Sequence, residues 1–432
     1  MSFKPVRKLE VWRTLMRGDK TLVGVLAQNR QGVFFQYSQE YLSHFGTVGN
    51  LSPYQLRPDT SIQAAPATPH FGLHGTFADS LPDGWGLLLQ DRMFRQQNIS
   101  PTAITAMDRL ALVGDRAMGA LSYQPATEQV QQNIYYTIGE LGLAAQAVFD
   151  GQTETVLQAL VAAGSSGGAR PKAQLFFSAA NAEQCTTEYK EGLEAWLVKF
   201  TSDYFTLGHD EGVCEAAYLQ LAKQARLHPP EWQLLPAPKS SGASYWLALK
   251  RFDVQNLGEG MIGKKHLLSA CALLDADYRA PTLDYQDLIK ATGQLCRSPQ
   301  AAQLQFRRAI FNLLASNQDD HSKNWAFVLH DSGEWQPAPF YDVTYSPHPY
   351  NQHATAFSGY GNAPPLKVMQ GLAADAGYAS WPEAQKEIAE IADTVMEFKQ
   401  VAAQLDVRRS RIAEIQATLA LRYQENKALF AP

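Results

Sequence analysis

The spacing of hydrophobic and polar positions divides the first third of the chain into strands, turns and helices. Residues 21–42 place two apolar runs around the polar turn 29–32, which predicts a β-hairpin. A Pro-rich loop is expected over 53–71. Residues 77–97 place Asp and Ser before an apolar-periodic run and predict a capped helix, and 106–123 predict a second helix followed by a short strand.

The pattern changes near residue 151. Short apolar runs at 173–177, 194–200 and 245–253 have the length of strands. Between the last two, residues 210–225 predict a helix with acidic residues at its start and Lys in its last turn. We therefore expect a small β-rich lobe with one helix.

After residue 256 the pattern predicts mostly helices. In the segment 298–317, Phe306, Ile310 and Leu313 lie on one face at spacings of four and three. The tail from Pro382 to Phe430 is periodic and helix-rich. These patterns predict an α+β protein in three parts, 1–125, 126–255 and 256–432.

Composition and charge limit the classes of function. The 432 residues are 45% hydrophobic and 18% charged, with a formal net charge of -5. This balance argues against a chain that binds nucleic acid through its overall field, and leaves room for a local basic patch or a DNA-binding partner. The four cysteines have no zinc-ligand spacing and are expected to be reduced thiols. Without a signal-like start or an apolar run near ~18 residues, we expect a cytoplasmic protein without a membrane span.

Candidate chemistry is concentrated in SNQDDHSKNWAF, residues 316–327. Asp319 and Asn324 have the D-x-x-x-x-N spacing of a protein-kinase catalytic loop, in which the Asp accepts a hydroxyl proton and the Asn oxygen holds magnesium. Asp320 would give a spacing of four, so Asp319 is the expected base, and Asp320 and Lys323 are expected to be solvated loop charges. The alternative is an ordinary polar loop after a helix.

Other segments could complete a nucleotide site. Asp342, after a strand and an Asp-Ser-Gly turn, is the expected second magnesium ligand, the alternative being a turn cap. Lys199 lies in an otherwise apolar strand, where it either reaches solvent or meets phosphates. Glu215 is its candidate partner, with Glu211 as the other choice in the same helix.

Two loops are weaker candidates. The Gly/Ser-rich segment 164–172 could cradle phosphates with its N–H groups, Arg170 and Lys172, although such loops are more often linkers. The backbone of Lys250, Arg251 and Phe252 could contact adenine, or it could simply end a strand.

The order of these motifs resembles the HipA-type toxin kinases of bacterial type II toxin–antitoxin modules. The motifs that carry the resemblance are GVFFQYSQEYL, FADSLPDGWG, DRLALVGDRAMGALSY, GGARPKA, LVKF, KRFD, NQDDHSKNWAF and PFYD, in that order. The resemblance implies a two-lobed fold like that of protein and phosphatidylinositol kinases, with an added N-terminal β-rich subdomain and a helical C-terminal lobe.

The resemblance also implies roles for residues. Asp319 would be the catalytic base, and Asn324 and Asp342 would hold Mg²⁺. The residues implied to contact ATP are Gly167, Gly168, Ala169, Arg170, Pro171 and Lys172 of the phosphate loop, Lys199, Lys250, Arg251 and Phe252 of the hinge, and His321, Ser322, Lys323, Asn324, Tyr341 and Asp342. Ser165, or its neighbour Ser166, would be autophosphorylated. Lys250 and Arg170-Pro171 depart from the residues that relatives often have there.

The expected function is that of a toxin: a Mg-ATP-dependent serine/threonine kinase that phosphorylates a protein such as an aminoacyl-tRNA synthetase. The implied partner is a helix-turn-helix antitoxin dimer (HipB-like), which would make most of the contact with operator DNA. One alternative is a pseudokinase-like co-repressor that binds the antitoxin on DNA. Another is a lipid or small-molecule kinase.

Overall fold

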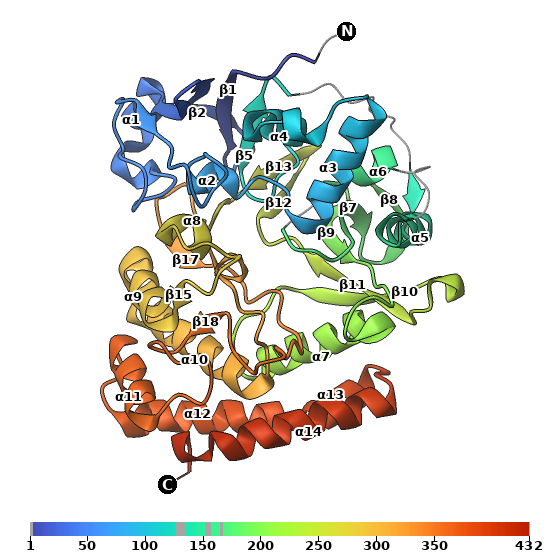
Figure 1. Cartoon of the computed structure of the whole chain (residues 1–432), viewed down its shortest axis with the longest axis vertical. Helices are drawn as coiled ribbons and strands as arrows, with labels where there is room; N and C mark the ends of the chain where they lie inside the picture. The colour runs from blue at the N-terminus through green and yellow to red at the C-terminus, as the bar shows by residue number, and fades with distance from the viewer. Residues whose placement is uncertain (1–2, 127–134, 152–156, 165–166, 432) are drawn as a thin grey trace. The chain divides into compact units, whose positions relative to one another are not determined.

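The computed structural model describes residues 3–126, 135–151, 157–164 and 167–431 (Figure 1). The chain forms two compact units built from alternating segments. Unit 1 comprises Met1–Ser202, Leu235–Asp275 and Val328–Glu334, and unit 2 comprises Asp203–Leu234, Ala276–Phe327 and Trp335–Pro432. The three-part division expected from the sequence stays a prediction.

The first sheet of unit 1 is antiparallel and has the strand order β4-β3-β2-β1-β5. Its strands are β1 (Lys8–Thr14), β2 (Lys20–Asn29), β3 (Gly32–Tyr37), β4 (Gln63–Ala64) and β5 (Leu121–Gln124). The predicted hairpin is therefore confirmed as β2 and β3. The helices α1 (Gln39–Phe45), α2 (Gly75–Ala78) and α4 (Ala106–Val113) belong to the same part of unit 1. Helix α4 confirms the second helix that the pattern predicted, and a capping box between Thr105 and Asp108 begins it.

The second sheet has the order β10-β11-β9-β7-β8-β6. Its strands are β6 (Tyr136–Thr137), β7 (Lys172–Ser178), β8 (Asn181–Thr186), β9 (Glu194–Lys199), β10 (Trp232–Pro236) and β11 (Tyr245–Lys250). The three strands predicted from apolar runs are β7, β9 and β11. They form its centre because β9 is antiparallel to both β7 and β11. The helices α3 (Gly84–Gln96), α5 (Ile138–Phe149) and α6 (Leu157–Ala162) supply residues to the hydrophobic core of this part.

The expectation of mostly helices after residue 256 is wrong for the segment up to 269. Strands β12 (Val254–Gly258) and β13 (Met261–Lys264) form a hairpin, and β14 (His266–Ser269) follows before the short helix α8 (Ala270–Leu274). The turn Gly258-Glu259-Gly260 has positive φ at all three residues, which two glycines make accessible. The pairing of these two strands overrides the weak local pattern.

Unit 2 is largely helical. Its main helices are α7 (Glu211–Gln224), α9 (Tyr285–Cys296), α10 (Pro299–Ala315), α11 (Leu366–Asp375), α12 (Trp381–Met396), α13 (Phe398–Gln404) and α14 (Arg409–Glu425). The predicted helical tail is confirmed as α12 to α14. The helix predicted to belong with the strands of the small lobe is α7, and it packs with unit 2 instead.

Helix α10 has the predicted buried face. Phe306, Ile310 and Leu313 are all buried. The Ser298 side chain caps its N-terminus by accepting the N–H of Ala301 at 3.2 Å. At the other end Ser316 has φ 52, so the helix stops and the chain turns into the segment 316–327.

Two further expectations can be compared with the structure. All four cysteines are free thiols, as predicted. Over the ranges described, no helix combines the length and the apolar character needed to cross a bilayer.

Candidate active site

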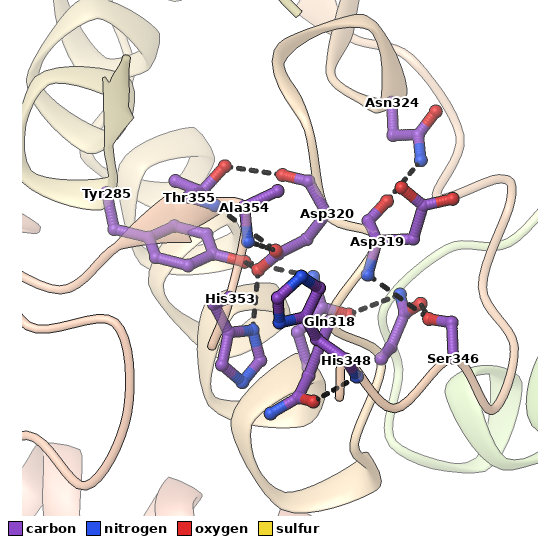
Figure 2. A network of polar contacts seen from close by, with 12 residues as sticks. Tyr285, Gln318, Asp319, Asp320, Asn324, Ser346, His348, His353, Ala354 and Thr355 are labelled. Atoms are coloured by element: carbon purple, nitrogen blue, oxygen red, sulfur yellow. Dashed lines mark hydrogen bonds and ion pairs between the residues drawn. The ribbon is translucent and has the colours of Figure 1, made fainter. Parts of the chain in front are cut away.

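The two adjacent aspartates of the segment 316–327 point in opposite directions (Figure 2). The Asp319 side chain is 67% exposed, whereas that of Asp320 is fully buried. The backbone N–H of Asp319 donates to the Ser346 hydroxyl at 3.2 Å, which holds the residue in place while its carboxylate faces outward. This arrangement supports Asp319, rather than Asp320, as the base.

The expectation that Asp320 is a solvated loop charge is wrong. Its carboxylate accepts hydrogen bonds from the Tyr285 hydroxyl, from the N–H of Ala354 at 2.9 Å and from the N–H of Thr355 at 3.2 Å. It also contacts His353 Nδ1 at 2.8 Å (Figure 2). A buried carboxylate requires such partners, and here they come from α9 and from the segment that forms β18 (Thr355–Ala356). Asp320 therefore anchors the candidate catalytic loop to the interior of unit 2.

Lys323 also differs from a freely solvated charge. Its side chain is half-buried, and Nζ lies 4.4 Å from the centre of the Tyr278 ring. The His321 ring lies against the same tyrosine at 5.9 Å, and its Nε2 is 3.9 Å from Asp319 Oδ1. Tyr278 thus orders the residues on either side of the buried Ser322, whose hydroxyl donates to the carbonyl of Ala276 at 2.9 Å.

The second half of the loop approaches the segment that carries Asp342. Asn324 Nδ2 donates to the carbonyl of Asp319 at 2.7 Å, so the amide oxygen points away from Asp319 (Figure 2). The Tyr341 hydroxyl donates to the carbonyl of Lys323 at 2.8 Å. Because Tyr341 precedes Asp342 and Lys323 precedes Asn324, this bond brings the two expected metal ligands into neighbouring segments.

Two polar residues of α10 support these segments from the interior. The buried Arg308 donates to the carbonyls of Leu227 and Ala338, both at 3.0 Å. The buried Asn312 donates to the Tyr285 hydroxyl at 3.0 Å and accepts from Asn317 Nδ2 at 2.9 Å. The periodicity of α10 marks these positions as interior, but the sequence does not show which loops they hold.

Asp342 has an unusual backbone. Its φ is 57, in the left-handed region that residues other than glycine rarely occupy. Carboxylate and amide oxygens are the ligands that Mg²⁺ prefers, and Asp342 and Asn324 supply one of each. These two residues therefore fit a magnesium ion.

In unit 1 the candidate phosphate loop lies over the start of β7. Lys172 and Lys199 are direct cross-strand partners on β7 and β9, so their side chains lie on the same face of the sheet. Both lysines are buried, and Lys172 Nζ donates to the carbonyl of Gly167 in the loop. Two buried ammonium groups at adjacent positions are suited to a polyanion such as the phosphates of ATP.

Helix α3 holds this loop, a connection that the sequence did not reveal. Asp83 stands at the N-cap position of α3, but the side-chain cap that the pattern predicted for this helix is not present. The Asp83 carboxylate accepts the N–H of Gly168 instead. The N–H of Trp85 donates to the carbonyl of Gly168 at 3.1 Å, and its indole Nε1 donates to that of Lys172 at 2.9 Å. The run Asp-Gly-Trp in the motif FADSLPDGWG was the only sequence feature that could have indicated this contact. Only the tertiary structure shows that these residues bind the loop 167–172.

The residues expected to form the hinge lie at the C-terminal end of β11 and just after it. Lys250 Nζ forms an ion pair with Glu194 at 2.5 Å. The N–H of Arg251 donates to the carbonyl of Ala195 at 2.9 Å, so this donor is used within the sheet. The Arg251 guanidinium is buried against Asp253, and Phe252 is half-buried.

The structure thus groups the expected residues within each unit. Unit 1 contains Gly167 to Lys172, Lys199 and Lys250 to Phe252, and unit 2 contains Asp319 to Asn324, Tyr341 and Asp342. The pairing of Lys199 with Glu215 or Glu211 stays a prediction, as do the contacts with ATP. Ser165 and Ser166 lie outside the described residues.

Known proteins resemble the chain along most of its length. Residues 15–124 match the family model of the HipA N-terminal domain, and residues 164–407 match that of the HipA-like C-terminal domain. The serine/threonine-protein kinase toxin HipA of Shewanella oneidensis is 31% identical over 114 residues, which cover 22% of this chain and 26% of that protein. The match therefore spans about a quarter of the length of this curated relative.

A solved structure establishes the fold. A chain from the Shewanella oneidensis MR-1 toxin–antitoxin complex of HipA, HipB and operator DNA superimposes with a TM-score of 0.70 at 19% identity, covering 97% of each chain. The expected α+β fold is confirmed. Since the C-terminal family model alone covers more than half of the sequence, the chain belongs to the HipA family.

Proposed function

We propose that this chain is a Mg-ATP-dependent serine/threonine protein kinase and the toxin of a type II toxin–antitoxin module. The observation that carries the proposal is the pair of buried lysines, Lys172 and Lys199, at directly opposed positions under the loop 167–172. Ammonium groups form strong charge-assisted hydrogen bonds with phosphate oxygens, and two of them at opposed positions on one face of the sheet suit the phosphates of a nucleotide.

The residues of unit 2 supply the remaining roles. Asp319, with its exposed carboxylate, orients the acceptor hydroxyl and accepts its proton. Asn324 and Asp342 hold magnesium, which neutralises charge on the transferred phosphoryl group when it is bound. Asp320, Tyr341 and Arg308 do not react, and keep these segments in position through the hydrogen bonds described above.

Family membership supports a proposal for the substrate class and the partner. We propose that the acceptor is a protein hydroxyl, with an aminoacyl-tRNA synthetase as the first candidate class, and that Ser165 or Ser166 is also modified. The Shewanella chain was solved with HipB and operator DNA. We propose an equivalent helix-turn-helix partner here, and the net charge of -5 is consistent with a partner that makes most of the DNA contact.

The test is phosphoryl transfer by the purified chain, with labelled ATP and Mg²⁺ in a lysate depleted of its own kinases. We expect label in protein, and we expect Asp319→Ala to lower the rate by ~10²–10⁴-fold, the usual contribution of a general base. The matched control is Asp287→Ala, because Asp287 is an exposed aspartate on α9 of the same unit and should leave the rate unchanged.

The result also separates the alternatives. Label that enters lipids or small molecules instead of protein would identify the third candidate function. If ATP binds but no label is transferred, and a helix-turn-helix partner still assembles on DNA, the co-repressor alternative replaces the kinase.

A further inference from the structure

Unit 1 contains a large cavity that the proposed kinase chemistry does not use. Its volume is about 830 Å³. Its walls come from α3, α6, β7 and the hairpin of β12 and β13, which are labelled in Figure 1, and from the segment 187–189. Of the residues expected to contact ATP, Arg251 lines the cavity, although the hinge contact expected of it uses its backbone. None of the loop residues 167–172 and neither Lys199 nor Lys250 lines it.

Cations exceed anions on the cavity walls. The cationic side chains are Lys20, Arg116, Arg251 and Lys264, and the acidic ones are Asp115 and Glu188. Arg251 is already neutralised by the buried Asp253, to which its guanidinium donates. This leaves Lys20, Arg116 and Lys264 against Asp115 and Glu188, a formal excess of one positive charge.

Lys264 and Arg116 have only carbonyl partners in the described part of the chain. Lys264 is buried, and its Nζ donates to the carbonyl of Asp115 at 3.1 Å. Arg116 is half-buried and donates to the carbonyl of Leu112. Neither is within ion-pair distance of a carboxylate among the residues that the structure describes. The carboxylates of Asp115 and Glu188 act on Arg116, and those of Asp253 and Asp115 act on Lys264, from beyond ion-pair distance. Because burial disfavours both cations, an anion in the cavity that contacts them directly would be stabilised.

The electrostatics of Lys264 agree with a missing anion. The pKa of Lys264 is lowered to about 8, first by burial and second by repulsion from Arg251, while Asp253 and Asp115 act in the opposite direction. Lys20 also opposes the charged form. Burial is therefore the main obstacle to the charged form of Lys264, and an anion in direct contact with the ammonium group would favour that form.

We propose that this cavity binds a small phosphorylated molecule that carries hydroxyl groups, with Lys264 and Arg116 as the phosphate ligands. A planar guanidinium and an ammonium group together suit a phosphate. Asp115 and Glu188 are acceptors for the hydroxyl groups. The class of ligand is that of a sugar phosphate, and the site is separate from the proposed kinase function.

The first test uses the wild-type chain, with Mg²⁺ and a non-hydrolysable ATP analogue present throughout. Lysines are acetylated at pH 8 with and without ribose 5-phosphate, and acetylation is mapped by mass spectrometry. We expect the probe to lower labelling of Lys264 several-fold and to leave the exposed Lys8 unchanged. Unchanged labelling of Lys264 would overturn the proposal, and so would equal protection by ribose or acetate at the same ionic strength.

The second test measures affinity for ribose 5-phosphate by calorimetry under the same conditions. Lys264→Met should weaken binding about tenfold or more, which corresponds to about 1.4 kcal/mol. The control Lys8→Met should bind like the wild type. Equal binding by Lys264→Met and wild type would contradict the proposal. Failure of the ATP analogue to bind would count against the kinase function. The acetylation and calorimetry results for ribose 5-phosphate would still test the cavity proposal.

Discussion

At the scale of single residues, two neighbouring aspartates have different physical roles. Asp319 is exposed and bears its carboxylate on the outside of the loop, whereas Asp320 is buried among hydrogen-bond donors. Figure 2 shows the two side chains leaving the backbone in opposite directions, that of Asp320 toward Tyr285 and His353 and that of Asp319 away from them. One side of the loop can therefore perform chemistry while the other holds it to the core.

This arrangement predicts that Asp320→Asn lowers the free energy of unfolding by about 1–3 kcal/mol, because an amide NH₂ would face donors that now meet a carboxylate oxygen. Asp319→Asn is the matched substitution and should change stability by less than about 0.5 kcal/mol, since its side chain is exposed. Urea unfolding of both variants checks the prediction. Equal stability losses would show that Asp320 is not the anchor. Asp319→Asn should instead lose phosphoryl-transfer activity while its stability stays close to that of the wild type.

At the scale of elements, α10 organises the candidate active site of unit 2. Arg308 and Asn312 lie four residues apart on its buried side. Arg308 binds the carbonyl of Ala338, four residues before Asp342, and Asn312 binds the Tyr285 hydroxyl, which in turn donates to Asp320. A single rigid helix thus sets the positions of both segments that carry the expected reactive groups.

Removing the Arg308 guanidinium should therefore disturb the Asp342 segment. Arg308→Met leaves the carbonyls of Leu227 and Ala338 without this donor, and we expect a loss of roughly 2–4 kcal/mol in the free energy of unfolding. Arg307→Met is the comparison, because this neighbour is 16% exposed and makes its contacts elsewhere, with Glu387 at 3.3 Å and with the carbonyl of Ala225, so its loss should cost less. Chemical denaturation and magnesium-dependent activity should both be affected in Arg308→Met. A variant as stable as Arg307→Met would refute the role of Arg308.

At the scale of the whole molecule, the chain returns to each unit after leaving it. Unit 1 uses three separate segments and unit 2 uses three, so residues distant in sequence complete each core. An example is β14, where the buried His266 contacts the carbonyl of Leu51 through Nε2 at 2.9 Å. The stability of unit 1 therefore depends on contacts between its first and second segments.

This histidine makes stability depend on pH. Burial lowers the pKa of His266 to about 3. Below the ordinary value of ~6.5 the unfolded chain binds a proton that the folded chain excludes, so the free energy of unfolding should fall as pH drops from 6.5 toward 3. The expected loss from this group is roughly 2 kcal/mol at pH 5. Urea unfolding at pH 7 and pH 5 measures it. His266→Gln should flatten this dependence relative to His44→Gln, which changes an exposed histidine, and an identical slope in both variants would contradict the assignment.

Much of the local structure followed from the sequence because short-range periodicity determines it. The hairpin of β2 and β3, the strands β7, β9 and β11 and the buried face of α10 were all predicted from the spacing of apolar residues. The strands β12 to β14 were missed because their pattern is weak and their pairing supplies the stability.

The sequence by itself determined the elements, the motif order and the residue types available for chemistry, since these depend on neighbours a few positions apart. Only the tertiary structure decided which of two adjacent aspartates is buried, that Asp83 binds Gly168 rather than capping its own helix, and that Lys172 faces Lys199. Burial and the partner of a charge depend on segments that are far apart in the chain, and no local pattern specifies which of those segments will meet.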